Sequence, residues 1–529
     1  MTTDASGELL WELPGEPVAD GPHTVGRWLT DRAAVSPSRI AIDDRGVVIT
    51  YGDLEDRARE LCLDLRRAGY GPGDRIATVS GNSIDHVVAL FACAKAGIAF
   101  VPLSWRLTAR ELADTLQRAE AALLLVDDEY MGLALDARER VGGAPTLVEL
   151  GTTGIEAAVP PRRGEAAPLR AVRDDDPLLV VFTSGSEAAP KGVVLTHANC
   201  FWNNLALAGA MQLNADDVVL AILPQFHVAA WNVQPLLAWW VGATVVLERS
   251  FQPTRVLQLL QDRRVTVMMG VPTQYRLLAD DPRFASADLS RLRIALVGGA
   301  TMPAAVFDEW AARGVPLTQG YGLTEAAPNV LVLPPGEAAE HRGAVGRPYP
   351  HVDVCLADPA TGLILDGPAT GELWVRGPSV FAGYLGDPEA TARAMAGEWL
   401  RSGDLATRDG GGVYRIVDRL KEIFISGGEN VAPAEVEAAL CLHPLVREAA
   451  VVPVPDRVWG ERGLAFVTLT EGAVLSADEI TAHARSMLAA FKVPVHVEIV
   501  DELPRSTIEK LARSRLKERA LTLMEEDLA

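Results

Sequence analysis

Residues 178–192 read LLVVFTSGSEAAPKG, a short apolar run that changes abruptly into small and polar residues. The apolar run is long enough for one buried strand and too short for a core helix. The hydroxyls, backbone N–H groups and Lys191 that follow would surround one point, as the binding of a phosphate requires. The common phosphate-loop pattern G-x-x-x-x-G-K-[ST] does not fit, because Pro190 replaces its second glycine and Gly192 its hydroxyl residue. By itself, the stretch fits either a different phosphate-binding loop or an ordinary loop rich in serine and glycine.

The charge of the chain argues against a polyanionic partner. The 529 residues include 49 lysines and arginines against 70 aspartates and glutamates, which gives a net charge of −21. Because binding to nucleic acid depends mainly on neutralising phosphates, we expect no nucleic-acid partner. Five scattered cysteines without metal spacing, and an N-terminus without a signal peptide, predict a soluble cytoplasmic protein with reduced thiols. The most apolar segment, 87–103, is too short for a membrane span and contains Lys95.

The alternation of expected strands and helices before residue 300 predicts an α/β fold with mostly parallel, βαβ-type sheets. Residues 349–383 change to short strands with frequent Gly and Pro, which favours a small barrel-like β subdomain. A last unit, from about residue 422, is large enough for an independent α+β domain. Residues 151–177 are expected to form a surface connection. The expected helices are 24–36, 50–69, 84–96, 108–120, 198–211, 434–440 and 477–490, and the expected strands are 75–80, 100–103, 123–126, 178–182, 218–223, 243–247, 265–270, 293–297, 449–454 and 464–470.

Further motifs carry residue types that suit a nucleotide. Residues 298–300 read GGA after an expected strand, although a tight turn explains this motif as well. Residues 319–325 read QGYGLTE, in which two glycines let the backbone approach a flat ligand, the ring covers it, and the hydroxyl and carboxylate suit a phosphate and its Mg²⁺. Residues 401–404 read RSGD and place a carboxylate on a tight turn, where it would accept from two ribose hydroxyls. Residues 504–510 read PRSTIEK and place Lys510 on a loop before a basic helix. Taken one at a time, Asp404, Arg419 and Lys510 would be ordinary solvated charges.

The order and spacing of these motifs resemble the adenylate-forming superfamily, which includes acyl-CoA synthetases, peptide-synthetase adenylation domains and firefly luciferase. The resemblance runs from TYGDL at Thr50 to Lys510 and includes GEL at 371–373, GY at 383–384 and VAPAEVE at 431–437. It implies a large N-terminal domain over 1–420, with the ATP and acyl pockets, and a small mobile C-terminal domain over 421–529. It also implies a two-step reaction. A carboxylate attacks the α-phosphorus of MgATP to give acyl-AMP and pyrophosphate, and the thiol of coenzyme A then displaces AMP.

The resemblance also assigns roles to residues at matching positions. Glu325 would bind Mg²⁺, and Lys510 would bridge the carboxylate and the α-phosphate during adenylation, where a preorganised donor is typically worth about 3–4 kcal/mol. Lys421 would be the hinge of the mobile domain, and Gly427 and Gly428 would line a tunnel for the thiol arm of coenzyme A. The implied catalytic residues are Lys510, Thr324 and His227. The implied ATP- and AMP-binding residues are Thr183, Ser184, Gly185, Ser186 and Lys191 around the phosphates, Gly299, Ala300, Tyr321 and Gly322 at the adenine, Thr324 and Lys510 at the α-phosphate, and Asp404 and Arg419 at the ribose. The implied acyl pocket consists of His227, Val228, Trp231, Gly298 and Gln319.

The chain departs from the family pattern at several positions. The loop that usually reads TSGTTGxPKG has Ser186, Glu187 and Ala188 in place of TTG. Glu509 stands where a glycine usually precedes the catalytic lysine, and Asp418 stands where a glycine usually precedes the arginine near the hinge. Glu187 and Glu509 add negative charge near a polyphosphate, so their effect on adenylation is an open question.

Three functions remain open on the sequence. The first expectation is an ATP-dependent acid:CoA ligase that works as a monomer or homodimer. Its substrate would be a bulky hydrophobic acid, because Ala229, Ala230 and Gly298 leave room in the pocket. The second is an enzyme of the same family that loads an acyl carrier protein or performs only one half-reaction. The third is a nucleotide-binding regulator without activity, which the presence of Lys510 and Glu325 disfavours.

Overall fold

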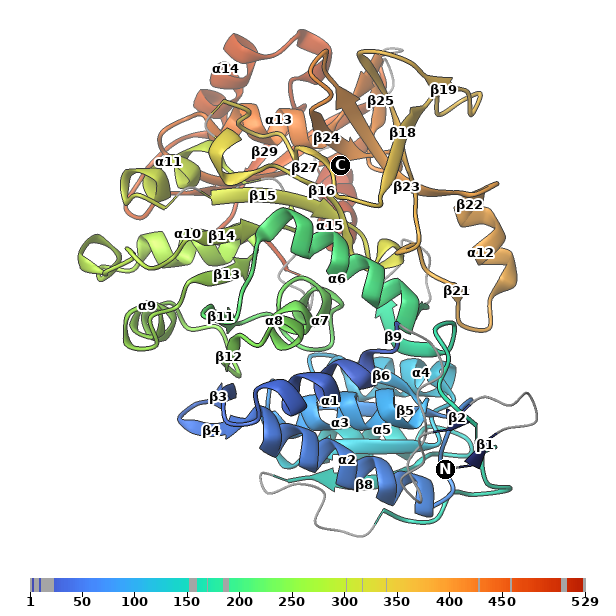
Figure 1. The fold of residues 1–529 in the computed structure, drawn as a ribbon. Coiled ribbons are helices and arrows are strands. Elements are labelled where there is room, and N and C mark those ends of the chain that lie inside the picture. The colour runs from blue at the N-terminus through green and yellow to red at the C-terminus, as the bar shows by residue number, and fades with distance from the viewer. Residues whose placement is uncertain are drawn as a thin grey trace. The chain divides into compact units, whose positions relative to one another are not determined.

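The computed structural model describes residues 2–3, 9–10, 23–151, 159–168, 170–183, 190–300, 302–315, 317–338, 340–426, 429–456, 459–505 and 511–526 (Figure 1). The chain forms two compact units. Unit 1 contains Met1–Val354 and Val375–Leu400, and unit 2 contains Cys355–Trp374 and Arg401–Ala529. The functional boundary predicted at Lys421 lies inside unit 2 and stays a prediction.

Unit 1 contains a seven-stranded sheet in which five neighbouring strands are parallel. The chain turns back after β9 to form β10, which pairs antiparallel with β9. On its other side, β10 pairs antiparallel with β21. Strand β10 was not predicted, because its alternation is short and begins inside the polar loop. The order is β21 (Gly383–Tyr384), β10 (Lys191–Thr196), β9 (Pro177–Thr183), β6 (Ala99–Leu103), β5 (Arg75–Val79), β7 (Leu123–Asp127) and β8 (Thr146–Leu150).

Unit 1 also contains a nine-stranded sheet whose central six strands are parallel. Strand β12, which follows β11 in the chain, lies on one side of β11, and β13 lies on its other side. The order of the strands therefore reverses at β11. In open α/β sheets, ligands bind outside the carboxyl ends of the strands at such a reversal. The order is β17 (Arg347–Pro348), β16 (Asn329–Val332), β15 (Leu317–Gly322), β14 (Ile294–Val297), β13 (Val267–Gly270), β11 (Val218–Ala221), β12 (Thr244–Leu247), β3 (Ile40–Asp44) and β4 (Val47–Thr50).

The helices of unit 1 cover both sheets, which confirms the predicted βαβ organisation. The predicted capping box of Thr108 and Glu111 is present at the start of its helix, and the predicted helix over 84–96 is confirmed. Leu220, Met268 and Trp310 belong to a buried cluster between one face of the nine-stranded sheet and α9, α10 and α11. The helices are α1 (Val25–Val35), α2 (Tyr51–Arg67), α3 (Ile84–Ala96), α4 (Ala109–Ala119), α5 (Met131–Arg138), α6 (His197–Met211), α7 (Ala229–Asn232), α8 (Pro235–Val241), α9 (Pro253–Asp262), α10 (Pro272–Asp280), α11 (Ala304–Ala312) and α12 (Pro388–Ala394). None of the described helices is long and apolar enough to cross a membrane.

Unit 2 contains short antiparallel strands followed by an α+β unit, as predicted. Strand β18 (Asp353–Ala357) pairs with β19 (Ile364–Leu365), and β23 (Trp399–Arg408) pairs with β24 (Tyr414–Arg419). In the α+β unit, the strand order is β26-β25-β28-β27, with β29 beside β28. Helices α13 (Pro433–Cys441) and α14 (Ala477–Met487) share one buried cluster with the sheet, and α15 (Arg513–Glu526) shares another. The strands are β25 (Phe424–Ser426), β26 (Glu429–Val431), β27 (Val446–Asp456), β28 (Gly460–Leu469) and β29 (His496–Ile499).

Candidate active site

The predicted phosphate loop connects β9 to β10. Thr183, the last residue of β9, lies opposite Lys191, the first residue of β10. The Thr183 hydroxyl donates to the Lys191 carbonyl at 3.5 Å. The pairing therefore holds the Lys191 backbone at the mouth of the loop.

Three elements of unit 1 bring a carboxylate, a phenol and an ammonium together. Tyr384 on β21 donates from its hydroxyl to Glu325 Oε1 at 2.9 Å. The Lys191 ammonium lies 5.4 Å from the centre of the Tyr384 ring, within the range of a cation–π contact. The Phe381 amide donates to the Glu325 carbonyl at 2.8 Å, which fixes the backbone of the short 3₁₀ helix Thr324–Ala326. Sequence reasoning gave Tyr384 no role, although it quoted the GY motif that contains it.

This arrangement is suited to a phosphate that carries a magnesium ion. The ammonium supplies positive charge for phosphate oxygens, and a single carboxylate suffices for Mg²⁺, which keeps several waters and takes further oxygens from the phosphates. No group of three or more His, Cys, Asp or Glu side chains that could hold a metal ion occurs among the described residues, so an all-protein metal cage is not seen there. Glu325 therefore fits the role that the sequence implied for it.

The turn before Glu325 requires a glycine. A Cβ atom at Gly322 would lie 1.8 Å from the Pro328 carbonyl oxygen, and the Leu323 amide donates to that same oxygen at 3.1 Å. No side chain fits in that space. Tyr321 precedes the turn at the end of β15 and is half-buried, as is Thr324. Gly322 thus places Thr324 and Glu325 directly after the carboxyl end of a parallel strand.

The GGA motif lies at the same edge of the nine-stranded sheet. It follows β14, and Val297 on β14 pairs with Gln319 on β15, so Gly299 and Ala300 lie beside the end of the neighbouring strand. Gly299 has φ = +83°, a left-handed conformation that favours glycine. A Cβ at Gly298 would lie 3.0 Å from Met269 Cε, so this buried glycine makes room for the Met269 side chain.

The segment with His227 follows β11 at this same edge. The Phe226 and His227 rings lie 4.4 Å apart, and Val228 is buried. Trp231 is fully buried, and its indole N–H donates to the Gln225 carbonyl at 2.6 Å. The Trp231 ring contacts buried rings of α3 and β6 edge to face, so its side chain lies in the protein core, and its predicted place in the acyl pocket stays a prediction.

A buried hydrogen-bond network that sequence reasoning missed holds this segment in place. His86 Nδ1 lies 3.0 Å from Gln225 Oε1, and His86 Nε2 lies 2.8 Å from the Thr78 hydroxyl. The backbone N–H of Gln225 donates to Asn82 Oδ1 at 3.0 Å. Burial lowers the pKa of His86 to about 4, although its hydrogen bond to Gln225 opposes the shift, so the ring is neutral near pH 7. No local pattern signals this network, because its members are far apart in the chain.

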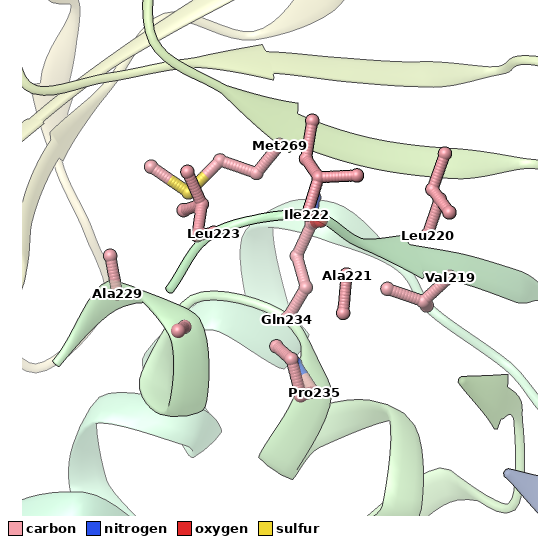
Figure 2. A pocket seen from close by; sticks show the side chains of 10 residues that line it. Val219, Leu220, Ala221, Ile222, Leu223, Ala229, Gln234, Pro235 and Met269 are labelled. Carbon is pink, nitrogen blue, oxygen red and sulfur yellow. The ribbon is translucent and has the colours of Figure 1, made fainter. Parts of the chain in front are cut away.

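A small cavity lies between β11 and β13 on one side and α7 and α8 on the other (Figure 2). Its volume is about 10 Å³, roughly the room that one water molecule needs. The walls are apolar, with one exception, Gln234. The lining residues are Val219, Leu220, Ala221, Ile222, Leu223, Ala229, Ala230, Gln234, Pro235 and Met269.

In unit 2, Asp404 and Arg419 face each other across a strand pair. Arg419 Nε lies 2.6 Å from Asp404 Oδ1, and the side chain of Asp404 is almost fully buried. The RSGD turn is held by buried Glu372, which accepts from the Gly403 amide at 3.2 Å and forms an ion pair with Arg401. Sequence reasoning quoted Glu372 in the GEL motif without a role. The structure gives it one, the support of the turn that carries Asp404.

Lys421 follows two residues after Arg419 and is exposed. Partial desolvation and the nearby Arg419 charge lower the pKa of Lys421, while Glu422 and Asp404 oppose the shift. Several predicted site residues lie outside the described residues: Ser184, Gly185, Ser186 and Glu187 of the phosphate loop, Gly427 and Gly428, and Glu509 and Lys510.

Comparison with known proteins agrees with this geometry. Residues 29–385 match the family described as "AMP-binding enzyme", and residues 435–510 match its C-terminal domain. A feruloyl-CoA synthase of Amycolatopsis sp is 41% identical over 499 residues, with 94% of this chain and 99% of that protein covered. An indoleacetate–CoA ligase of Aromatoleum aromaticum is 34% identical, with 93% of this chain and 98% of that protein covered. The solved structure of ATP-bound MatB from Rhodopseudomonas palustris superposes with a TM-score of 0.86 at 30% identity, with 94% of this chain and 98% of that chain covered.

Proposed function

The chain belongs to the family of AMP-binding enzymes, and from that premise we propose that it is an ATP-dependent acid:CoA ligase. It converts a carboxylic acid and ATP into an acyl-AMP and pyrophosphate, and then transfers the acyl group to the thiol of coenzyme A. The observation that carries the proposal is the contact of Tyr384 with both Glu325 and Lys191, because it unites a magnesium ligand and a phosphate-binding cation at the end of the predicted phosphate loop.

We propose a division of labour along the nucleotide. Lys191 and the loop from Thr183 to Ser186 bind the β- and γ-phosphates, and Glu325 would hold a magnesium ion there. Mg²⁺, when bound, neutralises part of the charge that develops on the phosphates. Thr324 donates its hydroxyl to the α-phosphate, and Gly299, Ala300 and Tyr321 hold the adenine. Asp404 accepts from the ribose hydroxyls, and Arg419 orients the Asp404 carboxylate through their 2.6 Å ion pair.

The two half-reactions need different residues at the same acyl carboxylate. For adenylation we propose that Lys510 bridges the acid and the α-phosphate, where its charge stabilises the transition state. For thioester formation we propose that the domain after Lys421 turns about this residue, withdraws Lys510, and brings Gly427 and Gly428 to the path of the thiol. His227 lies beside the carboxylate of the acid in the first step and beside the carbonyl of acyl-AMP in the second.

We propose an aromatic or other bulky apolar acid as the substrate. The named acids of the two relatives, ferulate and indoleacetate, are both aromatic. In this chain the corresponding pocket is bordered by Val228, by Ala229 and Ala230 on α7, and by Gly298, which follows β14, all apolar or small. The acceptor thiol belongs to coenzyme A rather than to a carrier protein, in agreement with the names of these relatives.

The test uses the purified protein with ATP, Mg²⁺ and a panel of aryl, indolyl and straight-chain acids. Pyrophosphate release without coenzyme A reports adenylation, and mass detection of an acyl-CoA after its addition reports the second step. Glu325→Gln is expected to abolish most of the first signal. ATP binding without pyrophosphate release from any acid would refute the ligase, and loading of a carrier protein in preference to coenzyme A would refute the acceptor.

A further inference from the structure

The cavity lies on the face of the nine-stranded sheet that α7 and α8 cover. Ala221, at the end of β11, and Leu223 line this cavity and do not belong to the buried cluster that contains Leu220 and Ile222. Leu220 and Ile222 contribute to the lining as well. Met269 on β13 lines the same cavity, whereas its neighbour Met268 belongs to that cluster. Figure 2 shows α7 and α8 on the opposite side of the cavity.

This cavity adjoins the residues proposed to hold the acid. Met269 is both a wall of the cavity and the side chain for which Gly298 makes room. Ala229, another wall, follows His227 by two residues. An acid whose carboxylate lies beside His227 would therefore direct its far end toward Met269 and the cavity.

Gln234 is the polar group at this far end. It is 2% exposed and extends from the start of α8 toward β11 (Figure 2). Its amide nitrogen is buried and has no hydrogen-bond partner in the part of the chain that the structure describes. A buried donor without an acceptor is costly, whereas an acceptor that enters the cavity would remove that cost.

From this geometry we infer that Gln234 is a specificity-determining residue that donates a hydrogen bond to an oxygen at the distal end of the acid. The cavity volume of about 10 Å³ matches a single oxygen. The other lining side chains are apolar and suit the carbon skeleton that carries this oxygen. The substrate class is therefore an apolar carboxylic acid with a hydroxyl or carbonyl oxygen remote from the carboxylate. This inference rests on the proposed acid:CoA ligase function.

The experiment compares acids that differ by one distal oxygen: 4-hydroxycinnamic against cinnamic acid, 3-(4-hydroxyphenyl)propanoic against 3-phenylpropanoic acid, and 7-oxooctanoic against octanoic acid. The readout is kcat/KM for pyrophosphate release with wild type, Gln234→Leu and the unbranched Gln234→Met, neither of which has a side-chain donor. For at least one pair, the wild type is expected to have a kcat/KM about tenfold or more higher for the acid with the distal oxygen than for the acid without it. The reason is that a site with an unpaired donor rejects the analogue that lacks the oxygen. Both variants are expected to bring that ratio within about twofold, by removing the donor.

Gln258→Leu, an exposed glutamine on α9, is the matched control and is expected to keep the wild-type ratio. A thermal melt of each variant separates lost folding from lost selectivity, and Gln234→Met covers the case in which leucine disturbs the core. An unchanged ratio in folded Gln234 variants, or a wild type that prefers the acids without the oxygen, overturns the inference while the ligase function stands. Absence of pyrophosphate release from every acid overturns the ligase function and this inference with it.

Discussion

The Tyr384 hydroxyl offers a sharp test of the proposed ATP step. Tyr384→Phe removes the 2.9 Å hydrogen bond to Glu325 and leaves the ring that lies beside Lys191. A hydrogen bond to a charged group contributes about 1.5–3 kcal/mol. Because Tyr384 and Glu325 are both half-buried, we expect the lower end of that range. About 1.5 kcal/mol corresponds to roughly a tenfold loss in kcat/KM for MgATP, through a magnesium ligand that is less firmly oriented.

The assay is pyrophosphate release in the absence of coenzyme A, measured against MgATP and then against Mg²⁺ at fixed ATP. The variant is expected to need more Mg²⁺ for half-maximal rate, an effect that a purely structural role of Tyr384 would not produce. Tyr414→Phe is the matched control, since its hydroxyl accepts a long hydrogen bond of 3.4 Å from Arg408 Nη1. A Tyr384→Phe enzyme within about twofold of wild type at every Mg²⁺ concentration would show that this contact does not serve the ATP step.

Four further predictions concern single residues. Lys510→Ala should lower acyl-adenylate formation by orders of magnitude and spare thioester formation from supplied acyl-AMP, because its charge acts only in the first transition state; an equal loss in both steps would contradict the role. Lys421→Pro should do the reverse, because proline restricts φ at the proposed hinge, and unchanged turnover with coenzyme A would place the pivot elsewhere. Glu187→Thr should change KM for ATP less than about fivefold if the carboxylate faces solvent, and a much larger drop would mean that it faces the phosphates. Burial lowers the pKa of His86 from 6.5 to about 4, so the unfolded chain takes up this proton first as the pH falls. The stability that the neutral ring contributes is therefore present above pH 6.5 and lost toward pH 4. The difference in unfolding free energy between wild type and His86→Gln should narrow over that range, and parallel curves of unfolding free energy against pH would refute the assignment.

Local pattern was sufficient for α1 to α4, α6, α13 and α14 and for most of the parallel strands, whereas α5, α7 to α10 and α12 and the parallel strands β3, β8 and β15 were not predicted. Thr108 and Glu111 mark the start of a helix because a capping box depends on four consecutive residues. The helix over 477–490 was predicted too long, since α14 ends at Met487, where the chain leaves helical conformation at Leu488. Strand β10 was missed because its stability comes from pairing with β9 and β21 on both sides, which no stretch of sequence displays.

The motifs by themselves specified the types of groups at the proposed site: the carboxylate of Glu325, the ammonium of Lys191 and the Asp404–Arg419 pair. Their chemistry depends on residue type and order, which the sequence contains in full. Only the tertiary structure decided which groups meet. Residue 384 reaches Glu325 because β21 joins the sheet beside β10, and Gln234 meets a cavity because α8 returns across β11 and β13. Hydrogen bonds and cavities form between segments that are distant along the chain, so their geometry follows from packing and not from any local pattern.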